Sequence, residues 1–248
     1  IWLATVVVSG ISYLSYLLKR YVFHESGVLV SGIIGGLYSS TATISVLARK
    51  SRKASAQEAN EYVAAMLLAV SMMFLRFMIL ILIFSREIFM SIYHYLLIMS
   101  VVAAVVAWFI HSRQRRSKDL PADSEEEDSS NPLEFKVALI FATLFVIFTV
   151  LTHYTLVYAG TGGLNLLSFV SGFSDITPFI LNLLQNTGSV AALIITACSM
   201  QAILSNIMVN MFYALFFAGK GSKLRPWILG GFGVVIACNF VLLLFFYL

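Results

Sequence analysis

The sequence predicts an all-α integral membrane protein built of two inverted-topology repeats, each with three transmembrane helices and one broken re-entrant hairpin. Of the 248 residues, 60% are hydrophobic and only 11% are charged, whereas a soluble domain carries about 25% charged residues. Ten charged residues lie within residues 113–128, and the rest of the chain consists largely of apolar runs. This composition argues against a soluble enzyme or a nucleic-acid-binding protein.

Six apolar runs are close to or above the roughly 20 residues that cross a bilayer. Three of them precede the charged stretch, at about 1–18, 61–84 and 89–111, and three follow it, at about 133–158, 188–218 and 226–248. We therefore expect a multi-pass protein of the cell membrane whose main partner is the lipid bilayer.

Two further apolar segments, about 26–48 and 160–185, are rich in glycine, serine and threonine. Because glycine and proline disfavour a continuous helix, each segment is predicted to form two half-helices of a re-entrant hairpin. The expected interruptions are Gly27, Gly32, Gly35 and Gly36 in the first segment, and Gly160, Gly162, Gly163, Gly172 and Pro178 in the second.

Basic residues predict the orientation in the membrane. They cluster at residues 19–20, 49–53, 113–118 and 220–225, and cytoplasmic loops are enriched in lysine and arginine. All four clusters fall on one side if residues 26–48 enter and leave from the cytoplasm and residues 160–185 from outside. The N-terminus is then outside, and the net charge of +4 reflects topology rather than a nucleic-acid partner. If both segments were full crossings, some clusters would lie on the wrong side.

A charged linker at residues 112–132, basic first and then acidic, divides the chain. We expect a solvated cytoplasmic linker; a regulatory or lipid-headgroup contact is the alternative. The first repeat is then 1–111 and the second 133–248. Because the chain begins with Ile1, we expect it to be part of a longer protein.

The two halves show internal similarity. Residues 36–47 align with residues 172–183, and residues 69–72 with residues 197–200. Since each half contains an odd number of spans, the second half is inserted upside down, as in many transporters with binding sites near the midplane. A duplication without a transport role is the alternative.

Two ionisable residues are predicted to lie within the membrane, where charge is costly and typically functional. Arg76 sits 15 residues into its apolar run, and Asp175 lies at the break of the second hairpin. The two side chains either neutralise one another as a structural pair, or contact a ligand, or both. Arg76 alternatively reaches outward to the interface.

Hydroxyl-rich tips complete the predicted site. Ser39, Ser40 and Thr41 in the first hairpin, and the Ser174–Thr177 stretch with Asp175 in the second, are good N-cap sequences. Each would begin a half-helix whose N–H groups point to a shared midplane cavity. Ser205 and Asn206 fall mid-span in the second half at a position comparable to Arg76. Plain capping and interhelical hydrogen bonds are the alternatives.

The predicted site does not determine the sign of the transported charge. Helix N-termini and Arg76 favour an anion, whereas Asp175 with hydroxyl and carbonyl oxygens favours a hard cation such as Mg²⁺, with Asp175 as its metal ligand. The sequence contains none of the common metalloprotease, hydrolase or phosphate-loop motifs. We therefore expect no enzymatic activity and no cofactor beyond an ion carried as substrate.

Residues 36–51 resemble the C-terminal membrane domain of unknown function associated with the MgtC/SapB-type magnesium transporter family. Met73–Arg76, Gly172–Asp175 and Ser205–Asn206 are also similar to that group, and the resemblance covers most of the chain. It implies transport of a cation, with magnesium as the first candidate. Two positions differ from the pattern, Thr177 for a second aspartate and Asn210 for a lysine, and both lower the charge of the site.

The leading functional hypothesis is a transporter or channel that moves a small ion through a midplane site between two broken helices. The predicted site residues are Ser39, Ser40, Thr41, Arg76, Asp175, Thr177, Ser205 and Asn206. The alternatives are a non-transporting regulatory or scaffold protein with a membrane partner, and a translocator of anions or lipid headgroups. A homodimer is plausible because six spans and two hairpins make a small body.

Overall fold

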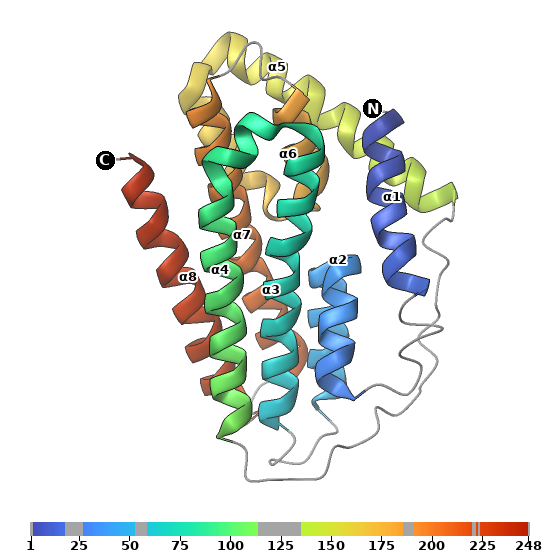
Figure 1. Ribbon diagram of the computed structural model, residues 1–248, viewed down its shortest axis with the longest axis vertical. Helices are drawn as coiled ribbons and strands as arrows, with labels where there is room; N and C mark the ends of the chain where they lie inside the picture. Colours follow the sequence, from blue (N-terminus) through green and yellow to red (C-terminus); the bar gives the residue numbers. More distant parts are fainter. Residues whose placement is uncertain are drawn as a thin grey trace.

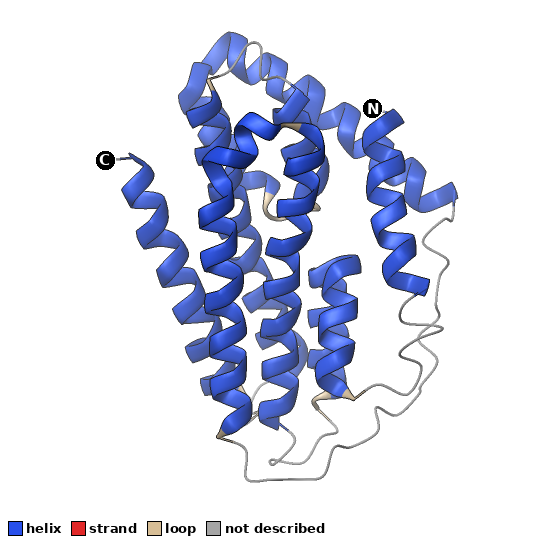
Figure 2. Cartoon of the chain, in the orientation of Figure 1, coloured by secondary structure: helices blue, strands red, loops and turns tan. Residues whose placement is uncertain are grey.

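The computed structural model describes residues 2–17, 27–52, 59–113, 135–185, 191–219, 222 and 224–247, and within these residues all regular structure is helical (Figure 2). The eight helices are α1 (Trp2–Leu17), α2 (Val28–Lys50), α3 (Ala59–Phe84), α4 (Arg86–Ser112), α5 (Phe135–Ser171), α6 (Ile176–Gln185), α7 (Ala192–Ala218) and α8 (Arg225–Tyr247).

Six helices are long and apolar enough to cross a membrane, namely α2, α3, α4, α5, α7 and α8. Five of them correspond to predicted spans, but the sixth does not. Of the run predicted at 1–18, the structure describes residues 2–17, which form α1. α2 meets the length criterion in its place, although it is not straight.

α2 folds back on itself at Ser39, whose backbone is extended rather than helical (φ −156°, ψ 108°). A Cβ placed on Gly35 would lie only 2.5 Å from Oγ1 of Thr43, so the two halves lie side by side (Figure 1). Each half has 11 residues, about 16 Å of helix, which is half of a bilayer core. We call residues 28–50 the first hairpin.

The break in the first hairpin differs from the expected one. Gly32, Gly35 and Gly36 were expected to interrupt the helix, but they lie inside its first half, and the interruption is at Ser39. The glycines instead allow close approach of other elements, as shown below.

α5 bends sharply at Gly160, whose backbone (φ 57°, ψ −150°) lies in a region that only glycine adopts easily. The segment after the bend turns inward, and α6 runs back after an interruption at residues 172–175 (Figure 1). Pro178 lies in the first turn of α6, where a missing N–H has no cost. We call residues 161–185 the second hairpin.

The two hairpins enter the bundle from opposite ends. Figure 1 shows both ends of the first hairpin at the bottom of the molecule and both ends of the second at the top, with their tips toward the middle. α3 and α7 each contact both hairpins and are the two most buried of the six long helices. We call α3 and α7 the inner helices.

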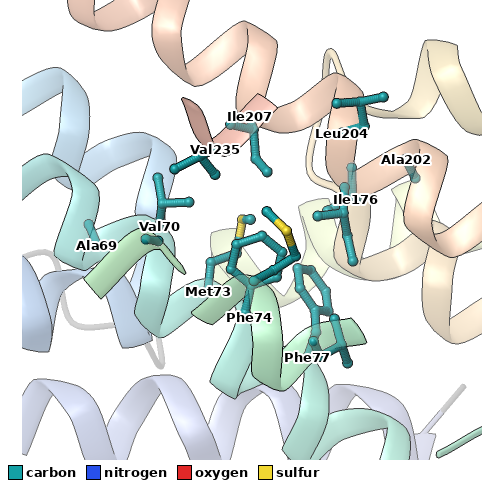
Figure 3. Close-up of a cluster of buried hydrophobic side chains, with 14 of the residues drawn as sticks. Ala69, Val70, Met73, Phe74, Phe77, Ile176, Ala202, Leu204, Ile207 and Val235 are labelled. Carbon is teal, nitrogen blue, oxygen red and sulfur yellow. The ribbon is translucent and has the colours of Figure 1, made fainter. Parts of the chain in front are cut away.

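An apolar cluster joins the inner helices to α6 and α8 (Figure 3). It includes Met73, Phe74 and Phe77 of α3, Ile176 of α6 and Ile207 of α7. Large apolar side chains also cover the outside, among them Val105 and Trp108, which are 55% and 69% exposed. Because such a surface is incompatible with water, these helices are embedded in a lipid bilayer.

Candidate functional site

The first hairpin packs on α3 through glycine. A Cβ on Gly32 would lie 2.3 Å from the carbonyl oxygen of Ala65, and a Cβ on Gly36 would lie 2.5 Å from Cα of Ala69. Both distances are shorter than any real contact. The first half of this hairpin therefore lies against the α3 backbone at a distance that only glycine permits. This contact sets the position of the hairpin tip along α3.

Both hairpin tips carry N-caps, as the sequence predicts. In the first hairpin, Oγ of Ser39 accepts a hydrogen bond from the N–H of Ala42 (3.3 Å). In the second, Oδ1 of Asp175 accepts one from the N–H of Thr177 (2.9 Å). Each tip is thus the positive end of the half-helix that leaves it.

Arg76 of α3 connects the two tips. Its Nη1 donates to the carbonyl oxygen of Tyr38 (2.6 Å), at the end of the first half-helix. Its Nη2 contacts Oγ1 of Thr177 (3.5 Å), in the first turn of α6. The Arg76 side chain is only 9% exposed, so it points between the hairpins, and the outward-reaching alternative is wrong.

Asp175 acts on Arg76 through space. Its carboxylate attracts the guanidinium electrostatically, while one carboxylate oxygen caps α6. Asp175 itself is exposed, and the hydrogen bonds of Arg76 go to Tyr38 and Thr177 instead. The two charges therefore compensate one another in part, without Asp175 occupying the guanidinium.

Arg76 keeps one donor unused. Its Nε is buried and has no hydrogen-bond partner in the described part of the chain. A buried, unpaired donor on a charged group is costly in a low-dielectric environment. Native structures therefore seldom contain one without a functional or solvent partner.

The inner helix α7 contacts the first half of the second hairpin through polar groups. Oγ of Ser205 donates to the carbonyl oxygen of Phe169 (2.7 Å), and Nδ2 of Asn206 donates to that of Gly172 (3.2 Å). Nδ2 of Asn210 then donates to Oδ1 of Asn206 (3.1 Å). A Cβ on Gly172 would lie 2.4 Å from Cβ of Ser205, so glycine permits the approach here too.

The eight predicted site residues thus fall into three groups. Arg76, Thr177, Asp175 and the tip residue Ser39 lie around the junction of the two hairpins. Ser205 and Asn206 hold the second hairpin from α7. Ser40 is buried and Thr41 is partly buried behind the first tip, and within the described residues no hydrogen bond links either side chain to the second hairpin.

Three participants were missing from the predicted site. Two are backbone carbonyls, those of Tyr38 and Gly172, for which side-chain chemistry gives no signal. The third is Asn210, whose buried Oδ1 has no hydrogen-bond partner among the residues that the structure describes. A polar amide in the middle of an apolar run could have identified Asn210 as a candidate from the sequence.

A metal ion at Asp175 would need ligands other than acidic, histidine or cysteine side chains. Among the described residues, no group of three or more such side chains is close enough to hold one. Carbonyl oxygens, hydroxyls and water would have to complete the coordination of a hard cation.

Comparison with known proteins identifies the family but not an activity. A family model described as a domain of unknown function, DUF4010, matches residues 6–218. An uncharacterized protein of Aquifex aeolicus (strain VF5) is 26% identical over 203 residues, which are 79% of this chain and 85% of the relative. No solved structure matches. The chain belongs to the DUF4010 family, and its expected links to MgtC/SapB-type proteins and to magnesium stay predictions.

Proposed function

We propose that this member of the DUF4010 family is a membrane transporter or channel that carries a small ion through a site between the two hairpin tips. The observation that carries the proposal is Arg76, a buried cation that contacts both tips and retains an unpaired donor. Ionisable residues within a membrane bundle are characteristic of ion and substrate pathways.

A repeat relationship supports the proposal. Gly36 packs on Ala69 and Gly172 on Ser205, with a separation of 33 residues in both halves, and each glycine lies three residues before a capping residue. These matches favour two inverted-topology repeats, residues 1–111 and 133–248, whose re-entrant hairpins enter from opposite faces. Ala69 then corresponds to Ser205, not to Ala197 as the sequence comparison alone suggested.

The arrangement of basic residues supports the expected orientation. The Arg49 guanidinium lies 4.3 Å from the centre of the Phe217 ring, and Arg52 donates to the carbonyl oxygens of Phe216 and Phe217. The basic end of α2 and the end of α7 therefore share one end of the bundle. By the positive-inside rule this supports the proposal that this end faces the cytoplasm, with the linker 112–132 inside and the N-terminus outside. Most of that linker and the basic pair at 19–20 lie outside the described residues.

Magnesium is the candidate cation that the family resemblance implies, with Asp175 as its ligand. The proposal of a site between the tips does not depend on this choice. An expected homodimer likewise stays a prediction.

Transport by reconstituted protein tests the proposal. Purified protein in liposomes is assayed for Mg²⁺ entry with an encapsulated indicator, and for net current on a supported membrane when chloride or acetate salts are exchanged. We expect Arg76→Ala and Asp175→Asn to change the flux, while Arg86→Gln, at the short turn between α3 and α4, leaves it unchanged. Equal flux in wild type and both tip variants, with helicity and elution volume preserved, would contradict the assignment and favour a scaffold role.

A further inference from the structure

We infer that the site between the hairpin tips takes a planar oxyanion of the carboxylate type, which Arg76 binds through its Nε and Nη2 atoms. This inference rests on the proposed function, because it names the substrate class of the same site. It goes beyond the family resemblance, which implies a cation.

The unused hydrogen-bonding capacity of Arg76 lies on one edge of its guanidinium. The opposite atom, Nη1, is held at 2.6 Å by the carbonyl of Tyr38. On the Nε–Nη2 edge, Nη2 makes only a 3.5 Å contact with Thr177, and Nε has no partner among the described residues. Two parallel N–H groups on this edge match the two oxygens of a carboxylate, which is the geometry of the strongest arginine contacts.

A helix N-terminus also borders that edge. Thr177 belongs to the first turn of α6, where N–H groups lack intrahelical acceptors and the helix dipole favours an anion. The negative C-terminal end of the first half-helix, by contrast, already interacts with Arg76, because the Tyr38 carbonyl accepts a hydrogen bond from it. The local field at the edge is therefore that of a guanidinium and a helix N-terminus, partly offset by the Asp175 carboxylate.

The Asp175 carboxylate competes with the anion for the Arg76 guanidinium. The carboxylate is close enough to attract Arg76, but one oxygen is engaged in capping α6. It lies at an exposed tip beside Phe173 and Ser174. An asparagine at this position still caps a helix but no longer competes. A divalent cation at Asp175 would be repelled by Arg76 at short range.

The anion inference is tested by ligand-dependent stability. The Tm of the detergent-purified full chain is measured while sodium chloride is replaced by sodium acetate at constant ionic strength, and separately with MgCl₂. A ligand that binds only the folded state raises the Tm in a saturable manner. We expect acetate to raise the Tm of the wild type. In Arg76→Lys, which keeps the charge but loses the paired N–H edge, we expect the acetate concentration at half of the maximal Tm rise (the acetate midpoint) to increase about ten-fold or more. In Asp175→Asn we expect the midpoint to decrease several-fold.

The other outcomes separate the two proposals. An acetate effect that is equal in all three proteins, or equal to that of chloride, is a general salt effect and overturns the inference. A rise with MgCl₂ that Asp175→Asn abolishes overturns the anion but supports an ion site at the tips. If Arg76→Lys does not fold, Asp175→Asn decides alone, and an unchanged or higher acetate midpoint overturns the inference. The proposed transport role fails separately, through unaltered flux in the tip variants.

Discussion

The two hairpins are built alike but held differently. In each, a capping residue begins the second half-helix, a glycine three residues earlier lies against an inner helix, and a side chain from that inner helix donates to a carbonyl near the tip. In the first hairpin the cap is the hydroxyl of Ser39 and the donor is the cation Arg76. In the second the cap is the carboxylate of Asp175 and the donor is the neutral Asn206.

The difference divides a charge pair between the two halves of the chain. Arg76 belongs to the N-terminal half, yet it reaches Thr177 and is attracted by Asp175 of the C-terminal half. Asn206, by contrast, makes its hydrogen bonds within the C-terminal half, to the carbonyl oxygen of Gly172 and from Nδ2 of Asn210. The N-terminal half thus supplies the positive charge and the C-terminal half the negative charge, so an electrostatic attraction joins the two halves at the junction of the tips.

The close contact of the first hairpin with α3 is the point where a substitution should have the largest effect. In Gly36→Val the new side chain meets the backbone of Ala69, which cannot move aside, and we expect a loss of about 3 kcal/mol in the free energy of unfolding. Unfolding in mixed detergent micelles measures it. Gly230→Val on the outer face of α8, with nothing within 4 Å of its Cβ position, is the matched control, and an equal loss there would contradict the account.

Exchanging the two inner-helix donors for apolar residues tests the charge difference directly. Arg76→Met leaves the Tyr38 carbonyl without its charged donor, and we expect a loss of about 2 kcal/mol, typical of a charge-assisted bond. Asn206→Leu removes a neutral donor to Gly172, with an expected loss of about 1 kcal/mol. The same unfolding assay compares them. A smaller effect at Arg76 than at Asn206 would show that the cation does not hold the tips together.

A double-mutant cycle isolates the coupling between the repeats. Because Arg76 and Asp175 interact through space rather than in a hydrogen-bonded pair, we expect a coupling free energy of about 1 kcal/mol between Arg76→Gln and Asp175→Asn. The free energy of unfolding of the four proteins gives this value. Additive effects of the two substitutions would mean that the repeats are not coupled through these charges.

Substitutions of the two capping residues should reduce the free energy of unfolding least, and by different amounts. Ser39→Ala removes the acceptor for the Ala42 N–H, with an expected loss of about 1 kcal/mol. In the Arg76→Gln background, where the charge coupling to Arg76 is already absent, Asp175→Asn retains a capping oxygen and should cost only a few tenths of that as a cap. Thermal unfolding of the two variants checks the order. A greater loss in Asp175→Asn would mean that the carboxylate contributes mainly through its charge.

Composition and local chemistry were enough to predict five of the six long apolar helices, the two interrupted segments and their caps. Ser39 and Asp175 cap helices because hydroxyl and carboxylate oxygens accept from the first turn wherever the chain is placed. Gly36 was misread as a break because a missing Cβ serves two purposes, backbone freedom and close approach, and a single sequence does not separate them. The Tyr38 carbonyl was missed because every residue has one, and only the fold selects which one Arg76 reaches.

The central claim, that the hairpin tips meet at a water-accessible ion site within the membrane, is tested most directly by thiol labelling. Single cysteines replace Thr41 and Ser174, near the two tips, and Val105, on the outer face of α4, in a background in which Cys198 and Cys238 are serine. Intact membranes are then treated with a charged, water-soluble methanethiosulfonate reagent. The account predicts rapid labelling of the cysteines at positions 41 and 174 and no labelling at position 105. Because acetate is proposed to bind Arg76 between the tips, added acetate should slow the labelling at 41 and 174. Tip cysteines as unreactive as the one at 105 would contradict it.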